Sequence, residues 1–190
     1  MTLLALVRHG QTDWNAERRV QGRTDIPLND IGRAQALTAA ENLRGGGWTR
    51  IVSSSLGRAR ETAEIIAGVL GLPAPRAYSG LVERDYGVGE GTLVADLHAT
   101  YGHGDVPGGE TTAELAERVL AAIADVAADT GDEPTVVVAH GGVIRELLRL
   151  ATAGERPRPG ERVENAAVNV FRFDGDHLVL QSADLTTQYA

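Results

Sequence analysis

The sequence predicts an α/β fold, a three-layer sandwich with a mostly parallel central sheet and helices on both faces. Short apolar runs rich in β-branched residues alternate along the chain with segments whose apolar residues recur at helical spacing. Such alternation is typical of a parallel sheet covered by helices. The chain has 190 residues, of which 43% are hydrophobic, so it is long enough to bury one core. We therefore expect a single domain over residues 1–190.

Three apolar runs are the predicted central strands, because each has the length and the β-branched content of a buried strand. These runs are Leu3–Val7, Arg50–Ser53 and Thr135–Ala139. Near the end of the chain, Ala167–Phe173 and His177–Ala183 have the pattern of a hairpin around the turn at Asp174 and Gly175. The sheet is thus expected to be parallel in its centre and to close with an antiparallel hairpin.

Four helices are predicted in the intervening segments. Two of them show one buried stripe at positions i, i+4, i+7 and i+11. The stripes are Ala59, Ala63, Ile66 and Leu70 in one helix, and Leu115, Val119, Ala122 and Val126 in the other. The segments Ile31–Leu43 and Ile144–Ala151 are expected to form the other two.

Local signals mark where these helices begin and end. Thr111 and Glu114 have the spacing of a capping box, and the glycines at 45–47 and at Gly71 stop the first two helices. The segments Leu93–Pro107 and Gly154–Gly160 are predicted to be loops.

Charge and composition argue against several classes of protein. With 18 basic and 26 acidic residues the formal charge is −8, so the chain lacks the basic surface that nucleic acid demands. The absence of cysteine excludes disulfides, thiol nucleophiles and thiolate metal sites. The apolar run near the start is too short for a membrane span and lacks the basic start of a signal peptide. We therefore expect a cytoplasmic protein with neither a nucleic-acid nor a membrane partner.

Polar residues follow each of the three predicted central strands. Ligands of open α/β sheets bind beyond the carboxyl ends of the strands, so these residues are the candidates for a site. Arg8 and His9 end the first run, Ser54 to Gly57 lead from the second run to Arg58, and His140 ends the third. Two imidazoles and two guanidiniums are therefore expected to meet at one edge of the sheet.

This set of side chains favours phosphoryl transfer without a metal. Guanidinium groups hold the phosphoryl oxygens while an imidazole nitrogen attacks phosphorus in line, which gives a phosphohistidine intermediate. The departing alkoxide needs a proton, so a carboxylic acid with its pKa raised toward neutrality must lie close by. The candidates in polar loop sequence are Glu83, Asp85, Glu90 and Glu110.

Six motifs follow one another in a fixed order along the chain. They are residues 8–12 (RHGQT) with Trp14 and Asn15, 22–28 continued by 29–36, 54–63 with Arg58 and Thr62, 81–87 (LVERDYG), 107–111 (PGGET) and 139–142 (AHGG). In this order they resemble the histidine phosphatase superfamily, in its phosphoglycerate-mutase-like branch, and above all the small phosphatases of broad specificity. The resemblance covers nearly the whole chain.

The resemblance implies a role for each matching residue. The implied roles are His9 as nucleophile, Arg8, Arg58 and His140 as the phosphate clamp, Glu83 as proton donor and then as base, and Asn15 as a phosphate neighbour. Among the four carboxylates, only the resemblance selects Glu83.

Further residues are expected to contact the substrate. Gly141 lets the backbone approach the phosphate closely, and Arg23 and Arg84 are the better candidates for reaching the distal part of the substrate. His98 and His103 are expected on the surface, since they lack acidic partners at metal-ligand spacing. Neither a metal nor another cofactor is expected.

The predicted function is hydrolysis of small phosphorylated metabolites by a phosphomonoesterase. A bisphosphoglycerate-dependent phosphoglycerate mutase is one alternative, although related mutases carry a long insertion between the acid and the second histidine, and here Glu83 and His140 are only 57 positions apart. A phospholigand-binding module without turnover is another, but binding alone needs neither His9 nor Glu83. The sequence does not give the oligomeric state, but relatives in this family are often dimers, so the resemblance makes a homodimer one possible assembly.

Overall fold

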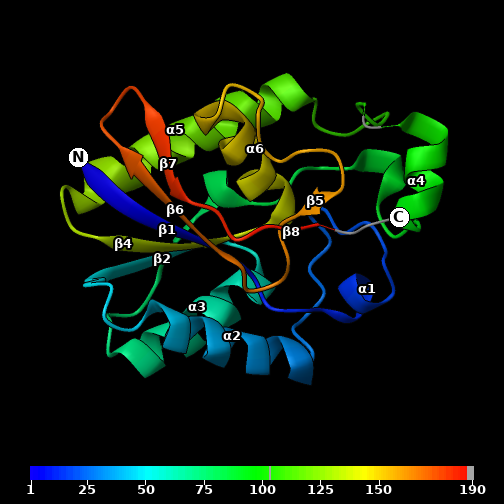
Figure 1. Ribbon diagram of the computed structural model, residues 1–190. Helices are drawn as coiled ribbons and strands as arrows, with labels where there is room; N and C mark the ends of the chain where they lie inside the picture. The colour runs from blue at the N-terminus through cyan, green and yellow to red at the C-terminus, as the bar shows by residue number, and fades with distance from the viewer. Residues whose placement is uncertain (103, 188–190) are drawn as a thin grey trace.

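The computed structural model describes residues 1–102 and 104–187 and shows a six-stranded sheet between two layers of helices (Figure 1). In spatial order the strands are β3 (Arg76–Tyr78), β2 (Arg50–Ser54), β4 (Thr135–Ala139), β1 (Thr2–Arg8), β6 (Val168–Phe173) and β7 (Leu178–Ser182). The pairs β3–β2, β2–β4 and β4–β1 are parallel, whereas β6 is antiparallel to β1 and β7 is antiparallel to β6. The three-layer, mostly parallel α/β fold predicted from the sequence is confirmed.

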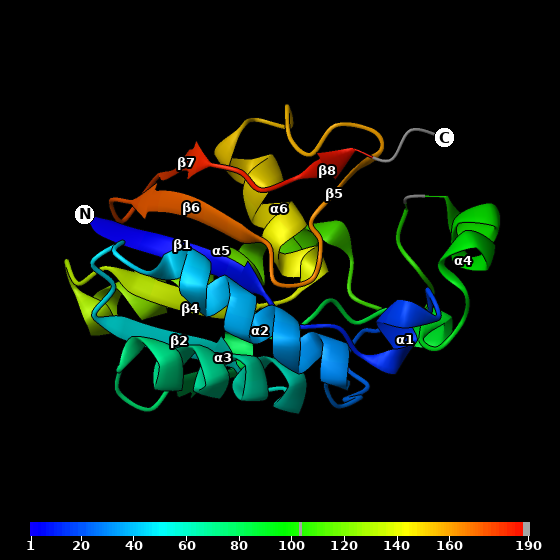
Figure 2. The same ribbon diagram turned by 60° about the horizontal axis from the view of Figure 1, so that its bottom comes forward.

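Two helices cover each face of the sheet (Figures 1 and 2). One face carries α2 (Asp30–Leu43) and α3 (Gly57–Leu70), and the other carries α5 (Thr112–Thr130) and α6 (Gly141–Ala151). Smaller elements lie beyond the carboxyl ends of the parallel strands or beside the sheet. They are α1 (Asp13–Ala16), α4 (Val94–Tyr101), the 3-10 turns Ser79–Leu81 and Gly87–Gly89, and the two-stranded sheet of β5 (Glu161–Arg162) and β8 (Thr186–Thr187).

The apolar character of β1 follows from its burial on both faces. Leu4 and Leu6 pack into the core under α5 and α6, while Ala5 and Val7 pack into the core over α2 and α3. Alternate residues of a strand point to opposite faces of the sheet. When both faces are covered, both sets of residues are buried and apolar. The strand thus ends with a polar residue only where it leaves the two cores, at Arg8.

The predicted strands and helices are found close to their expected ends. The three apolar runs form β1, β2 and β4, and the four predicted helices are found as α2, α3, α5 and α6. Gly71 takes a left-handed conformation at the end of α3, with φ of 68°. The hairpin is confirmed as β6 and β7, and its turn is closed by the Asp174 carboxylate, which accepts hydrogen bonds from the backbone N–H groups of Asp176 and His177.

The loop predicted over Leu93–Pro107 is wrong in its first half, because residues 94–101 form α4. Leu97 on this helix is buried against Val20 and Val106, and Tyr101 packs at the edge of the same small cluster. The helix is therefore stabilised by contacts with a segment far away in the sequence, which local patterns do not reveal. By contrast, residues 154–160 form turns and bends without a helix or strand, as expected.

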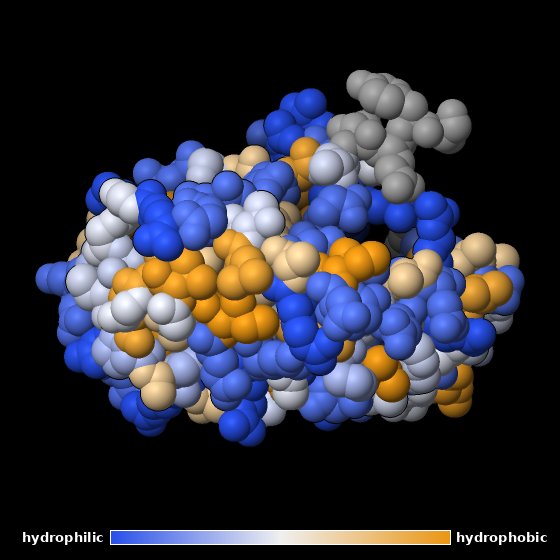
Figure 3. Space-filling view, turned by 90° about the horizontal axis from the view of Figure 1, so that it is seen from below, coloured by the Kyte–Doolittle hydropathy of each residue, from blue (hydrophilic) through white to orange (hydrophobic). Residues whose placement is uncertain are grey.

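The surface seen from below shows hydrophobic patches among a largely hydrophilic background (Figure 3). On α2, Ile31 and Leu37 are 58% and 50% exposed, so this helix is not polar over its whole outer face. Among the described residues, no helix is both long enough and apolar enough to cross a bilayer.

The capping box at the start of α5 gives a test of local stability. The Thr111 hydroxyl accepts a hydrogen bond from the N–H of Glu114, whose carboxylate accepts one from the Thr111 N–H. Thr111→Ala should lower the free energy of unfolding by about 1 kcal/mol, because it leaves an N–H group of the first turn without its partner. Urea unfolding measures this change.

The matched control is Thr38→Ala, which removes the same atoms from an exposed position inside α2. It should leave the stability unchanged or raise it slightly, since alanine is the better helix former. Equal effects of the two substitutions would argue against the capping role of Thr111.

Candidate active site

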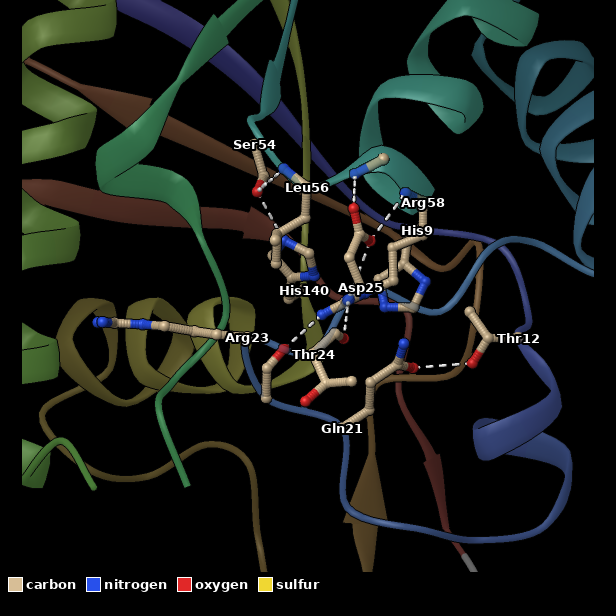
Figure 4. A network of polar contacts seen from close by, with 12 residues as sticks. His9, Thr12, Gln21, Arg23, Thr24, Asp25, Ser54, Leu56, Arg58 and His140 are labelled. Atoms are coloured by element: carbon tan, nitrogen blue, oxygen red, sulfur yellow. Dashed lines mark hydrogen bonds and ion pairs between the residues drawn. The ribbon is translucent and has the colours of Figure 1, made fainter. Parts of the chain in front are cut away.

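The ends of β1, β2 and β4 bring three predicted side chains together, as expected for adjacent parallel strands. His9 follows β1, His140 follows β4, and Arg58 lies in the first turn of α3, which comes shortly after β2. The ring centres of His9 and His140 are 5.2 Å apart, with their planes inclined by 60°. Figure 4 shows the two rings close to each other with Arg58 between and beside them.

The ring of His9 is held in one orientation. Its Nδ1 lies 2.7 Å from the carbonyl oxygen of Gly10, and only 3% of the residue is exposed. Because a carbonyl oxygen can only accept, Nδ1 carries the hydrogen, and the lone pair of the neutral ring is on Nε2. Burial, followed by the charges of Arg58 and Arg8, lowers the pKa of the His9 imidazole well below its usual range. His9 is therefore a neutral imidazole with a nucleophilic nitrogen.

The backbone around His9 is fixed by contacts from three other segments. The His9 N–H donates to the carbonyl of Ala139 at 3.0 Å, and the side-chain amide of Asn165 donates to the His9 carbonyl at 3.0 Å. The Gly10 N–H donates to the hydroxyl of Thr62 at 3.1 Å. The end of β4, α3 and the chain before β6 thus all position this residue.

Arg58 is the largest fully buried side chain of the described structure. Its Nη2 donates to the carbonyl of Gly22 at 2.7 Å, and its Nη1 donates to the carbonyl of Thr24 at 2.9 Å and lies 3.4 Å from the carboxylate of Asp25. Asp25 also accepts the N–H of Gly57, so it caps α3 from outside the helix. The two Nη groups thus hold the charge of Arg58 in place. Its Nε is buried without a partner among the described residues.

Arg8, the last residue of β1, brings a second guanidinium to the site. Its Nη1 donates to the carbonyl of Val163 at 2.7 Å, and its Nε is buried without a partner among the described residues. Gly141, where α6 begins, lies directly beside this guanidinium, and a side chain at that position would crowd Arg8 Nε at 3.3 Å. The structure thus places the backbone of Gly141 close to Arg8, and its approach to a phosphate stays a prediction.

The ring of His140 is fully buried and bonded at one nitrogen. Its Nε2 lies 2.7 Å from the hydroxyl oxygen of Ser54, while Nδ1 has no partner within the described residues. Burial, followed by the charge of Arg58, lowers the pKa of the His140 imidazole well below its usual range. His140 therefore joins His9 as a neutral ring.

Glu83 is the candidate acid that lies against the segment of the second histidine. Its carboxylate accepts the N–H of Gly142 at 2.9 Å, in the first turn of α6, and the N–H of Arg84 at 2.7 Å. Only 6% of Glu83 is exposed. These contacts place the Glu83 carboxylate against the backbone N–H of Gly142, two residues after His140 in the chain. Gly142 lies in the first turn of α6, where the N–H groups of the helix start favour an anion.

The other three candidate acids serve the loops around the site. Glu90 accepts hydrogen bonds from the N–H groups of Arg23 and Thr24, and Asp85 accepts the N–H of Gly87. Glu110 forms an ion pair with Arg118 at 2.6 Å. These contacts tie the three carboxylates to the loops around the site, whereas Glu83 contacts the segment that follows His140.

Both polar atoms of the Asn15 side chain form hydrogen bonds with other residues of the protein. Its Oδ1 accepts hydrogen bonds from the Asn165 amide and from the Thr12 N–H, and its amide nitrogen lies 3.3 Å from Oε1 of Gln21. Gln21, which the sequence reasoning missed, also accepts the Thr12 hydroxyl, and its own amide nitrogen is buried without a partner among the described residues. Figure 4 shows Gln21 next to His9.

Arg23 and Arg84 lie outside this group. Arg23 extends away from both imidazoles (Figure 4) and is 3.5 Å from the carboxylate of Asp85. Arg84 is engaged by Asp105 at 2.6 Å, and its guanidinium covers the ring of Tyr86. A cavity of about 610 Å³ lies beside Arg23 and Asp85. It is lined by Arg23, Asp85, Gly108, Gly109, Glu110, Glu114, Glu117, Arg118 and Ala121.

Of the remaining histidines that the structure describes, neither His98 nor His177 joins the site. His98 is exposed on α4, as expected, and His103 lies outside the described residues. Within the described part of the chain, no group of three or more His, Asp or Glu side chains has the arrangement of a metal site.

Comparison with known proteins identifies the family. The model of the histidine phosphatase superfamily (branch 1) matches residues 4–186. The chain belongs to this superfamily. It is 38% identical over 173 residues to the uncharacterized phosphatase PhoE of Bacillus subtilis, covering 91% of this chain and 89% of that protein. It is 40% identical over 172 residues to the probable phosphoglycerate mutase GpmB of Salmonella paratyphi B, covering 82% and 79%.

A solved structure of the superfamily agrees with the fold. The phosphoserine phosphatase of Entamoeba histolytica, in complex with 3-phosphoglyceric acid, superposes with a TM-score of 0.82 at 28% identity, covering 99% of this chain and 98% of that chain. Together with the family match, these relatives show that the chain is a phosphatase of the histidine phosphatase superfamily.

The lowered pKa values of the two imidazoles predict how stability depends on pH. In the unfolded chain the histidines bind protons near pH 6.5, but in the folded phosphatase they resist protonation. The unfolded state therefore binds more protons below about pH 6.5, and the free energy of unfolding falls as the pH is lowered through that window. Each imidazole contributes at most about 1.4 kcal/mol per pH unit.

Urea unfolding at a series of pH values between 7 and 5 measures this dependence. A variant carrying both His9→Gln and His140→Gln should lose less stability over the same range than the wild type, because neither titrating ring is left. Parallel curves for the two proteins would show that these imidazoles do not resist protonation.

Proposed function

We propose that this phosphatase hydrolyses phosphate monoesters of small metabolites in two steps, through a phosphohistidine on His9. One observation carries the proposal. Four buried nitrogens of residues beside His9 have no partner among the described residues, namely Arg8 Nε, Arg58 Nε, His140 Nδ1 and the amide nitrogen of Gln21. Buried donors of this kind are costly unless something accepts from them. A phosphoryl group supplies the anionic oxygens that they need.

In the first step, the lone pair on His9 Nε2 attacks phosphorus while the ester bond between phosphorus and the leaving oxygen breaks. Arg8, Arg58 and His140 hold the other phosphoryl oxygens and stabilise the charge that spreads over them in the transition state. The hydrogen bond from Nδ1 to Gly10 stabilises the positive ring as it forms. The leaving oxygen takes its proton from the carboxylic acid of Glu83.

In the second step, the carboxylate of Glu83 takes a proton from water. The water oxygen bonds to phosphorus as the bond to His9 Nε2 breaks, which restores the neutral imidazole and releases phosphate. The two guanidiniums supply the positive charge throughout, so the scheme uses no metal ion. Asn15 and Asn165 contribute by holding the loop and the His9 carbonyl rather than by contacting the phosphate.

Substrate selection belongs to the loop that follows Glu83. Arg23 lines the neighbouring cavity and is about half exposed, so it meets the leaving group of the substrate from the position in which it pairs with Asp85. Arg84 is engaged by Asp105 and by the carbonyl of Glu110, so its contribution is to hold this loop.

Substitution of the nucleophile tests the covalent step. His9→Ala should lower kcat by at least about 1,000-fold, because no other group is placed to attack phosphorus. It should keep some affinity for inorganic phosphate, since the clamp remains. The assay uses rapid quenching with a radiolabelled ester in the presence of a chelator, and the wild type should carry an acid-labile, alkali-stable label at His9.

The control is His177→Ala, which removes an exposed imidazole from the hairpin turn and should label like the wild type. Rapid turnover by a wild-type protein that never becomes labelled would refute the phosphohistidine.

Leaving groups of different basicity test the acid. Glu83→Gln should slow the hydrolysis of alkyl phosphates by about 100-fold or more, but that of p-nitrophenyl phosphate by less than about tenfold, because nitrophenolate departs without a proton. The same change at an exposed residue of α3, Glu64→Gln, is the control and should alter neither rate. Equal losses on both substrates would remove Glu83 from the role of acid.

A further inference from the structure

Ser54 is a buried residue at the end of β2 that the scheme above leaves without a role. It is fully buried, and its hydroxyl oxygen lies 2.7 Å from Nε2 of His140. The same oxygen accepts the N–H of Leu56 at 3.3 Å, where the chain turns from β2 into α3. The hydroxyl thus links the strand end directly to one of the two imidazoles.

The chemistry of His140 depends on which of its nitrogens carries the hydrogen. A neutral imidazole has one N–H donor and one lone pair. In Figure 4 the nitrogen that is not bonded to Ser54 lies on the side of His9 and Arg58, where the phosphoryl group is bound in the proposed function. A hydrogen on Nδ1 attracts a phosphoryl oxygen, whereas a lone pair there repels it.

The hydrogen bonds of Ser54 select between the two forms. Among the described residues, the Ser54 hydroxyl has no acceptor for its hydrogen other than Nε2 of His140. If Nε2 carried the hydrogen, the serine oxygen would accept twice and its own buried hydrogen would have no acceptor, which is costly. If Nε2 keeps the lone pair, the hydroxyl donates to it while accepting the N–H of Leu56, and only Nδ1 of His140 is left without a partner among the described residues.

We propose that Ser54 is a positioning residue that fixes His140 in the form with the hydrogen on Nδ1, so that the neutral ring donates to a phosphoryl oxygen. The proposal rests on the proposed function for the identity of the ligand. It explains why Nδ1 is buried without a partner among the described residues, since that donor is directed at the substrate. It also gives a neutral histidine a defined role beside two guanidiniums.

The experiment compares Ser54→Ala with Ser53→Ala. Ser53 is the preceding residue of β2, is equally buried, and its hydroxyl has no partner among the described residues, so it is a matched control. The nitrogen chemical shifts of the His140 ring, measured by NMR on ¹⁵N-labelled protein, report which nitrogen carries the hydrogen. Titration with inorganic phosphate reports the strength of the clamp.

We expect the wild type and Ser53→Ala to show the hydrogen on Nδ1 of His140. Ser54→Ala should show a mixture of the two forms, and its dissociation constant for phosphate should rise by about tenfold. Two results overturn the proposal. One is a wild-type ring with the hydrogen on Nε2, and the other is a Ser54→Ala variant that keeps the Nδ1 form and binds phosphate like the wild type.

Neither measurement depends on turnover. A protein that shows the expected ring form and phosphate affinity, yet never forms a covalent bond at His9, would lose the proposed function while keeping the role of Ser54. The wild-type spectrum also tests the proposal by itself if Ser54→Ala fails to fold.

Discussion

Burial of positive charge beside two neutral imidazoles is the constraint on which the site depends. Arg58 and Arg8 carry their charges into the interior, where backbone carbonyls accept from their Nη groups but leave both Nε groups without partners among the described residues. The same charges, added to burial, keep His9 and His140 neutral. A pocket with positive charge, hydrogen-bond donors without partners and an imidazole lone pair suits a phosphate ester. When no anion is bound, these buried donors lower the stability of the folded protein.

The sheet explains how distant residues reach this pocket with fixed geometry. β4 lies between β1 and β2, so the residues that follow these three strands must meet at one edge. The chain before β6 adds the carbonyl of Val163 and the amide of Asn165, which hold Arg8 and His9. The segment before β6 thus stabilises the conformation at the end of β1, and His9 is positioned by contacts with several segments rather than by a free loop.

The parts of the fold and the site that could be predicted from the sequence are those that depend on hydrophobic patterns and on the residues at strand ends. Apolar runs located β1, β2 and β4, and the parallel order then brought His9, Arg58 and His140 together without further information. The sequence did not predict α4, because Leu97 owes its burial to the remote Val20. Glu83 was selected by family resemblance alone, since its place against Gly142 depends on a long loop whose path no local pattern gives. Asn165 and Gln21 were missed because an isolated amide in a sequence carries no signal of its partners.

The central claim is that the lone pair on His9 Nε2 faces a phosphoryl group held by Arg8, Arg58 and His140. A crystal structure of the protein with vanadate, which adopts the five-coordinate geometry of phosphoryl transfer, tests it most directly. The account predicts a bond between vanadium and His9 Nε2, with the other vanadate oxygens within hydrogen-bond distance of Arg8, Arg58 and His140 Nδ1. A vanadate bonded to another side chain, or bound away from the ends of β1 and β4, would contradict it.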